Sequence, residues 1–82
     1  MFTRAQADGA IPNGTRVRKV VSDPGDTHPV GSVGIVLGSF AAPEPVPAFE
    51  HVRHFYFIEW QQHPRVAMGI TDFKVRPLAG GE

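Results

Sequence analysis

Glycine and proline interrupt this chain at short intervals, and their spacing limits what it can fold into. Nine glycines and eight prolines are spread over 82 residues, between short apolar runs. Both residues are unfavourable inside helices and central strands, so they mark turns between short elements. We therefore expect an all-β domain of short strands.

Five segments have the alternating or β-branched composition of strands. In residue numbers they are 15–21, 33–40, 53–60, 65–70 and 74–78. The alternation of the first segment breaks at Lys19, which predicts a bulge or a twist near that residue. The run Thr71-Asp72-Phe73 predicts a single helical turn before the last strand. Five short strands with almost no helix predict a five-stranded, SH3-like small barrel.

The length of the chain allows one domain with one small core. We expect residues 14–78 to form the barrel. Residues 1–13 are too short for a helix that is stable by itself, so we expect a flexible or docked N-terminal arm. Residues 79–82 are expected to form a frayed tail.

The composition excludes several classes of protein. Eight basic and eight acidic side chains cancel, which excludes a strongly basic nucleic-acid coat protein and a strongly acidic mimic. The lack of cysteine excludes disulfides, thiolate catalysis, cysteine-type zinc sites and iron–sulfur clusters. No apolar run is long enough to span a membrane, and no hydrophobic stretch follows Met1 as in a secretory signal. We therefore expect a cytoplasmic protein without a membrane partner.

Four runs of glycines, turn prolines and strand residues point to a known group. They are Gly14-Thr15-Arg16-Val17-Arg18, Pro24-Gly25-Asp26-Thr27, Gly31-Ser32-Val33-Gly34-Ile35-Val36 and Tyr56-Phe57-Ile58-Glu59-Trp60. Across residues 14–78 this pattern resembles the SH3-like domains of nitrile hydratase β-subunits and electron-transport accessory proteins, and also short uncharacterised bacterial proteins. The resemblance implies a fold and no catalytic residue, because the metal of nitrile hydratases lies in a cysteine cluster on another subunit.

The third strand is apolar on both of its faces. The side chains expected to face the interior are Tyr56, Ile58 and Trp60, and those expected to face outward are Phe55, Phe57 and Glu59. Two adjacent phenylalanines would be costly in water without a cover, because burying each contributes about 1.5–3 kcal/mol. The cover is either the long 41–52 loop or Phe2 of the arm, or it is a partner protein or second copy that also contacts Phe49. A stacking platform for nucleic-acid bases is a third alternative.

Four cations are expected on neighbouring first and last strands. They are Arg16, Arg18, Lys74 and Arg76. Like charges that face one another across a strand pair are destabilising, so the group requires a counter-charge. Either Asp72 or the Asp23/Asp26 loop supplies that charge, or the cations form a patch for nucleic acid or an acidic protein, as in KOW-like small barrels.

The residues that could carry catalysis or bind a metal do not form a recognisable set. The four histidines are His28, His51, His54 and His63. His51 and His54 would face opposite sides of a strand, so we expect surface or turn histidines, no metal site and no cofactor. Glu59 is a hypothetical general base, but a salt bridge to Arg53 or Arg65 is the simpler expectation.

We therefore expect a non-enzymatic module that binds a protein partner or itself through Phe49, Phe55, Phe57 and Glu59. A nucleic-acid-binding module that uses Arg16, Arg18, Lys74 and Arg76 is the alternative. A subunit that acquires chemistry only with its partner is a third.

Overall fold

The computed structural model of this chain describes residues 5–42 and 52–78, and it confirms an all-β fold. The elements are β1 (Arg16–Lys19), β2 (Val33–Ala41), β3 (His54–Trp60), β4 (Met68–Thr71), the 3-10 turn η2 (Asp72–Lys74) and β5 (Val75–Pro77). The helical turn expected before the last strand is present, one residue later than predicted. Within the described residues, no helix has the length and apolar character needed to cross a membrane.

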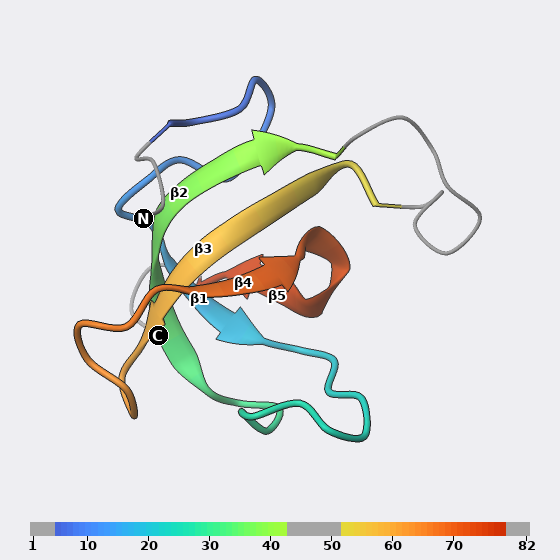
Figure 1. Cartoon of the computed structure of the whole chain (residues 1–82), viewed down its shortest axis with the longest axis vertical. Coiled ribbons are helices and arrows are strands. Elements are labelled where there is room, and N and C mark those ends of the chain that lie inside the picture. Colours follow the sequence, from blue (N-terminus) through green and yellow to red (C-terminus); the bar gives the residue numbers. More distant parts are fainter. Residues whose placement is uncertain (1–4, 43–51, 79–82) are drawn as a thin grey trace.

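The five strands form one antiparallel sheet in the order β4-β3-β2-β1-β5 (Figure 1). The long strands β2 and β3 run side by side at its centre, and β4 and β5 lie at its two edges. The ladders of the described residues do not join β4 to β5, so the sheet is open. A closed barrel would require hydrogen bonds between β4 and β5, and the observed strand pairs do not include that one.

The bulge lies in β2 and not in β1, where it was predicted. The pairing of β1 with β5 is regular through Lys19, which lies opposite Val75. In the pairing of β2 with β3 the register shifts between Val36 and Gly38, so Leu37 is the extra residue. Such a bulge bends the strand and reverses the faces on which the following side chains lie.

The core lies on one face of the sheet and is built from strand residues. Its buried members are Val17, Val36, Tyr56, Ile58, Trp60 and Val75. Ala10 and Ile11 of the N-terminal arm pack against this cluster. The inward and outward sets predicted for the third strand are therefore those observed in β3.

The described part of the N-terminal arm is docked on β2 and β3. The amide of Ala7 donates a hydrogen bond to Ser39 Oγ at 3.0 Å, and the amide of Ile11 donates to the Tyr56 hydroxyl at 2.9 Å. The amide of Ser39 donates to the carbonyl of Ala5 at 2.9 Å. The frayed tail expected at 79–82 lies outside the described residues.

Candidate functional site

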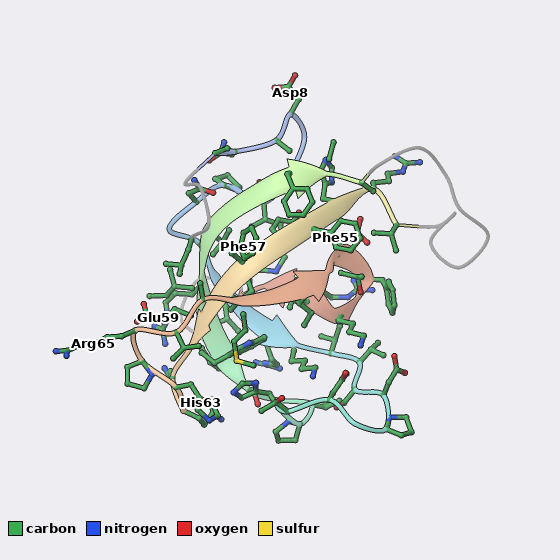
Figure 2. The ribbon with its side chains drawn as sticks, viewed as in Figure 1. Asp8, Phe55, Phe57, Glu59, His63 and Arg65 are labelled. Carbon is green, nitrogen blue, oxygen red and sulfur yellow. The ribbon has the colours of Figure 1, made fainter. Side chains whose placement is uncertain are left out.

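The outer faces of β2 and β3 carry three aromatic rings, one of which contacts the other two. Phe40 of β2 stacks on Phe55, with ring centroids 5.3 Å apart and an angle of 18° between the planes. It also contacts Phe57, at a centroid distance of 5.7 Å. Phe55 and Phe57 follow one another along β3 (Figure 2). We call Phe40, Phe55 and Phe57 the phenyl cluster.

The strand register explains how these rings come together. Phe55 lies opposite Phe40, and Phe57 lies between Gly38 on one neighbouring strand and Gly69 on the other. Glycine has no side chain, so the ring of Phe57 has space on both sides and Phe40 can lean over it. Phe40 remains 44% exposed, whereas Phe55 and Phe57 are half-buried.

The sequence prediction missed Phe40, and the bulge is the reason. Alternation from Val36 would place residues 38 and 40 on the inner face. The extra residue Leu37 instead turns Ser39 inward, where it is buried, and Phe40 outward. The proposed contact residue Phe49, like Phe2 and the 43–51 part of the loop, lies outside the described residues.

Glu59 does not belong to the phenyl cluster, although it lies on the same face of β3. Its carboxylate accepts a hydrogen bond from the backbone amide of Arg65 at 2.6 Å. Arg65 has a φ of 70°, in the left-handed region that side chains other than glycine rarely adopt. Glu59 therefore holds the turn between β3 and β4, and its recorded bond is to the backbone of Arg65 and not to a guanidinium.

Lys74 was expected to share a surface with Arg16, Arg18 and Arg76. Its ammonium group instead forms an ion network with Asp23, Asp26 and Lys19. Its Nζ is 2.9 Å from Asp26 Oδ2 and 3.2 Å from Asp23 Oδ2. Lys19 joins the same carboxylate of Asp26 at 3.2 Å and is almost completely buried. The hydrogen bond from Lys74 is the main reason that the pKa of Asp26 lies well below its ordinary value. The same bond raises the pKa of Lys74.

For Lys74 the counter-charge comes from the Asp23/Asp26 loop, which was one of the two expected sources. Asp72, the other, has a different role. Its carboxylate accepts hydrogen bonds from the backbone amides of Arg53 at 2.9 Å and His54 at 3.0 Å. Asp72 thus ties η2 to the start of β3.

Three of the four predicted cations do share one exposed surface. Arg18 lies directly opposite Arg76 in the pairing of β1 with β5, and Arg16 lies two residues before Arg18 on the same face. Arg18 and Arg76 border a shallow hollow of about 170 Å³. We call Arg16, Arg18 and Arg76 the arginine face.

The histidines were expected at the surface or in turns, and one of them lies in a loop but is buried. His28 is 4% exposed and stacks on Trp60, with centroids 5.2 Å apart. Its Nε2 lies 2.7 Å from Nδ1 of His63. His54 contacts the carbonyl oxygen of Asp8 at 3.0 Å, and His51 lies outside the described residues. Among the described residues, no group of three or more acidic, histidine or cysteine side chains is arranged to hold a metal ion.

A cavity of about 360 Å³ lies beside β4. Its walls include the buried Trp60 and His28, Met68 and Ile70 of β4, and the ion-paired Lys74. Such a volume falls in the range of small-ligand sites, which is about 300–1,000 Å³.

Comparison with protein-family models, with curated proteins and with solved structures finds no match to this chain. Function is therefore inferred from the surfaces that the fold presents.

Proposed function

We propose that this chain is a non-enzymatic binding module whose contact surface is the phenyl cluster. The observation that carries the proposal is Phe40, which is 44% exposed on top of two other aromatic rings. Fully burying a phenylalanine contributes about 1.5–3 kcal/mol, so covering the rest of Phe40 is worth roughly 1 kcal/mol. Clustered aromatic rings of this kind are typical anchors of protein interfaces.

The edge strand beside the cluster indicates the form that a partner takes. β4 is an edge strand without proline, whereas the opposite edge strand, β5, contains Pro77. Proline blocks strand addition, so β4 is the better acceptor for an extended segment. An extended protein segment paired with β4 would lie next to Gly69 and Phe57, within reach of the phenyl cluster. The segment belongs to a protein partner or to a second copy of this chain.

The strand order and the 3-10 turn before β5 support the SH3-like arrangement as part of this proposal. They are compatible with a role as an accessory subunit, which the resemblance to nitrile hydratase β-subunits and electron-transport accessory proteins implies. Fold likeness alone does not assign a function, so the proposal rests on the phenyl cluster.

Phe40→Ser tests the proposal, and Ile35→Ser is its matched control. Both residues lie on β2 and have similar exposure, 44% and 40%, but Ile35 lies opposite Glu59 and outside the cluster. We expect Phe40→Ser to weaken association at least about fivefold, as the loss of roughly 1 kcal/mol requires. Ile35→Ser should leave association unchanged.

Sedimentation measures self-association, and capture from the native host with the three proteins as baits measures a partner. A species bound by the wild type and Ile35→Ser but lost with Phe40→Ser supports the proposal. A monomeric wild type whose captured proteins are the same for all three baits contradicts it.

The arginine face favours a second function, the binding of a nucleic acid. Arg18 and Arg76 lie opposite each other across a strand pair and are both exposed, so two guanidinium groups share one surface. Lys74 forms ion pairs with Asp26 and Asp23, so the arginine face contains three of the four cations that the sequence predicted for it. Phosphate groups are suitable anions because guanidinium groups bind them through two hydrogen bonds.

The test of this second function is the salt dependence of binding to random RNA and DNA. If two arginines each neutralise a phosphate, Arg18→Ser combined with Arg76→Ser should reduce the slope of log affinity against log salt by about 2. Arg53→Ser, at an exposed arginine directly before β3, is the control and should keep the slope. Wild-type protein that binds neither RNA nor DNA at low salt would refute the nucleic-acid function.

A further inference from the structure

Two imidazoles form a direct bridge between two loops. His28 lies in the loop between β1 and β2, and His63 lies in the turn between β3 and β4. Their facing nitrogens, Nε2 of His28 and Nδ1 of His63, are 2.7 Å apart, which is hydrogen-bond distance. One of these nitrogens must donate and the other must accept. The bridge therefore requires that one proton, and only one, lies between the two rings.

Protonation changes this bridge in two steps. When one imidazole gains a proton, a nitrogen of the other ring still accepts, so the contact persists in the singly charged pair. When both rings are charged, two N–H donors face each other and two positive charges repel. The second proton therefore breaks the bridge, whereas the first does not.

The surroundings oppose charging of His28 from several sides. On the ring of His28, burial against Trp60 of β3 lowers the pKa most, and the charges of His63 and of Lys19 on β1 lower it further. Asp26 in the loop of His28 faces Lys19, and Lys74 of η2 holds the other side of Asp26. The carboxylate of Asp26 is thus already shared by two lysines.

The backbone of His28 connects the same residue to the core. Its carbonyl oxygen accepts a hydrogen bond from Lys19 Nζ at 2.6 Å and one from Ser22 Oγ at 3.1 Å. Its ring covers Trp60, and both side chains line the cavity beside β4. Movement of His28 would therefore uncover Trp60 and widen that cavity.

We propose that His28 and His63 form a proton-operated latch that holds the β1–β2 loop against the β3–β4 turn. Uptake of the second proton releases the latch and opens the cavity at Trp60. Phe40, Phe55 and Phe57 line another part of the same cavity, but the latch itself consists of His28 and His63 and would exist whether or not the phenyl cluster binds a partner. Its ligand is the proton, and its effect is to make access to the cavity beside Trp60 depend on pH.

The direction of the pH effect follows from linkage. The folded protein holds the pKa of His28 below the ordinary value of about 6.5, so the unfolded chain binds that proton more readily. The stability that the latch contributes is therefore complete above about pH 6.5. It is lost as the pH falls below that value and through the pKa of the folded state.

The single tryptophan of the chain is Trp60, which makes its fluorescence a specific reporter. In the full-length wild type, collisional quenching by acrylamide should increase as the pH falls from about 8 to about 4.5, the range in which imidazoles titrate. Far-UV circular dichroism, measured in the same samples, should stay constant because the sheet remains folded.

Three variants locate the effect. His63→Gln places an uncharged amide whose oxygen can accept from a protonated His28, so the increase in quenching at low pH should be lost. His63→Ala removes the bridge, so Trp60 should be more accessible already at neutral pH. His54→Gln changes a histidine that contacts Asp8 and not Trp60, and it should behave as the wild type. His63 is exposed, so its substitutions should not prevent folding.

Two results would overturn the latch. One is a wild type whose quenching is constant over this pH range, or changes only together with the circular dichroism. The other is a pH response in His63→Gln that equals that of the wild type.

Discussion

Gly34→Ala is expected to lower the free energy of unfolding by about 3 kcal/mol, a large fraction of the roughly 5–15 kcal/mol that stabilises a single domain. A Cβ atom at this position would lie 2.6 Å from Ile58 Cγ2, 2.8 Å from the carbonyl oxygen of Glu59 and 3.0 Å from Trp60 Cε3. The contact with the backbone oxygen cannot be relieved by rotating a side chain. The sheet would have to separate at the point where β2 pairs with β3.

Gly69→Ala is the matched control for this effect. Gly69 also lies in a strand of the sheet, but a Cβ atom there would have no neighbour within 4 Å. Alanine should be neutral or stabilise β4 by about 0.5 kcal/mol, because glycine loses more conformational freedom on folding. Equilibrium unfolding in urea measures both variants. Equal midpoints for Gly34→Ala and Gly69→Ala would show that β2 and β3 do not approach as closely as described.

Asp26→Asn is expected to have the second large effect. Asp26 is the carboxylate that Lys19 and Lys74 share, and Lys19 is only 3% exposed. Without that negative charge, the buried ammonium of Lys19 keeps the carbonyl of His28 but loses its ion pair. Removing one partner of a buried pair is much more costly than removing one at the surface, so we expect the thermal midpoint to fall on the order of 10 °C.

Asp23→Asn is the control, because the side chain of Asp23 is 61% exposed and contacts only the outer side of Lys74. Exposed ion pairs contribute little, so its midpoint should fall by a few degrees at most. Differential scanning calorimetry of the three proteins makes the comparison. Equal midpoints for the two variants would contradict a structural role of Asp26.

The lowered pKa of Asp26 predicts how the free energy of unfolding changes with pH in acid solution. Its pKa is lowered chiefly by the hydrogen bond from Lys74, with the Asp23 amide and Lys19 acting in the same direction. Stability from a lowered pKa is present above the ordinary value of about 3.9 and is lost as the pH falls below it. Unfolding free energies of the wild type should therefore decrease between about pH 4 and about pH 2. Asp26→Asn should show a smaller decrease.

The two pH effects fall in separate windows. The stability contributed by the latch is lost as the pH falls below about 6.5. The stability contributed by Asp26 is lost as the pH falls below about 3.9. A titration of Trp60 accessibility near pH 5 therefore reports on the histidines and not on the ion network. The two proposals can be tested on one set of protein samples.

The faces of β3 show what local pattern is able to predict. Side chains alternate across any strand, so assigning Trp60 to the interior also assigned Ile58 and Tyr56 to it and left Phe55 and Phe57 outside. The all-β class and the helical turn before the last strand follow equally from local spacing of glycine, proline and β-branched residues.

The position of Phe40 shows where that reasoning fails. One extra residue at Leu37 reverses the faces of everything after it in β2, and no local signal in the alternation marks that residue. Lys74 was misplaced for a similar reason, because a shift of one residue moved it from the last strand into η2. There its ammonium reaches the carboxylates of a loop about 50 residues earlier in the chain.

The amino-acid sequence by itself determined the class of fold and the alternation within β3, because these depend on turn residues and on a period of two along one strand. It also determined that the outward face of β3 would be aromatic. Only the tertiary structure decided that Phe40 joins Phe55 and Phe57, that Asp26 binds two lysines, and that His28 meets His63. These contacts join residues of different strands and loops, and their distances depend on register, bulges and loop paths that the whole sheet settles together.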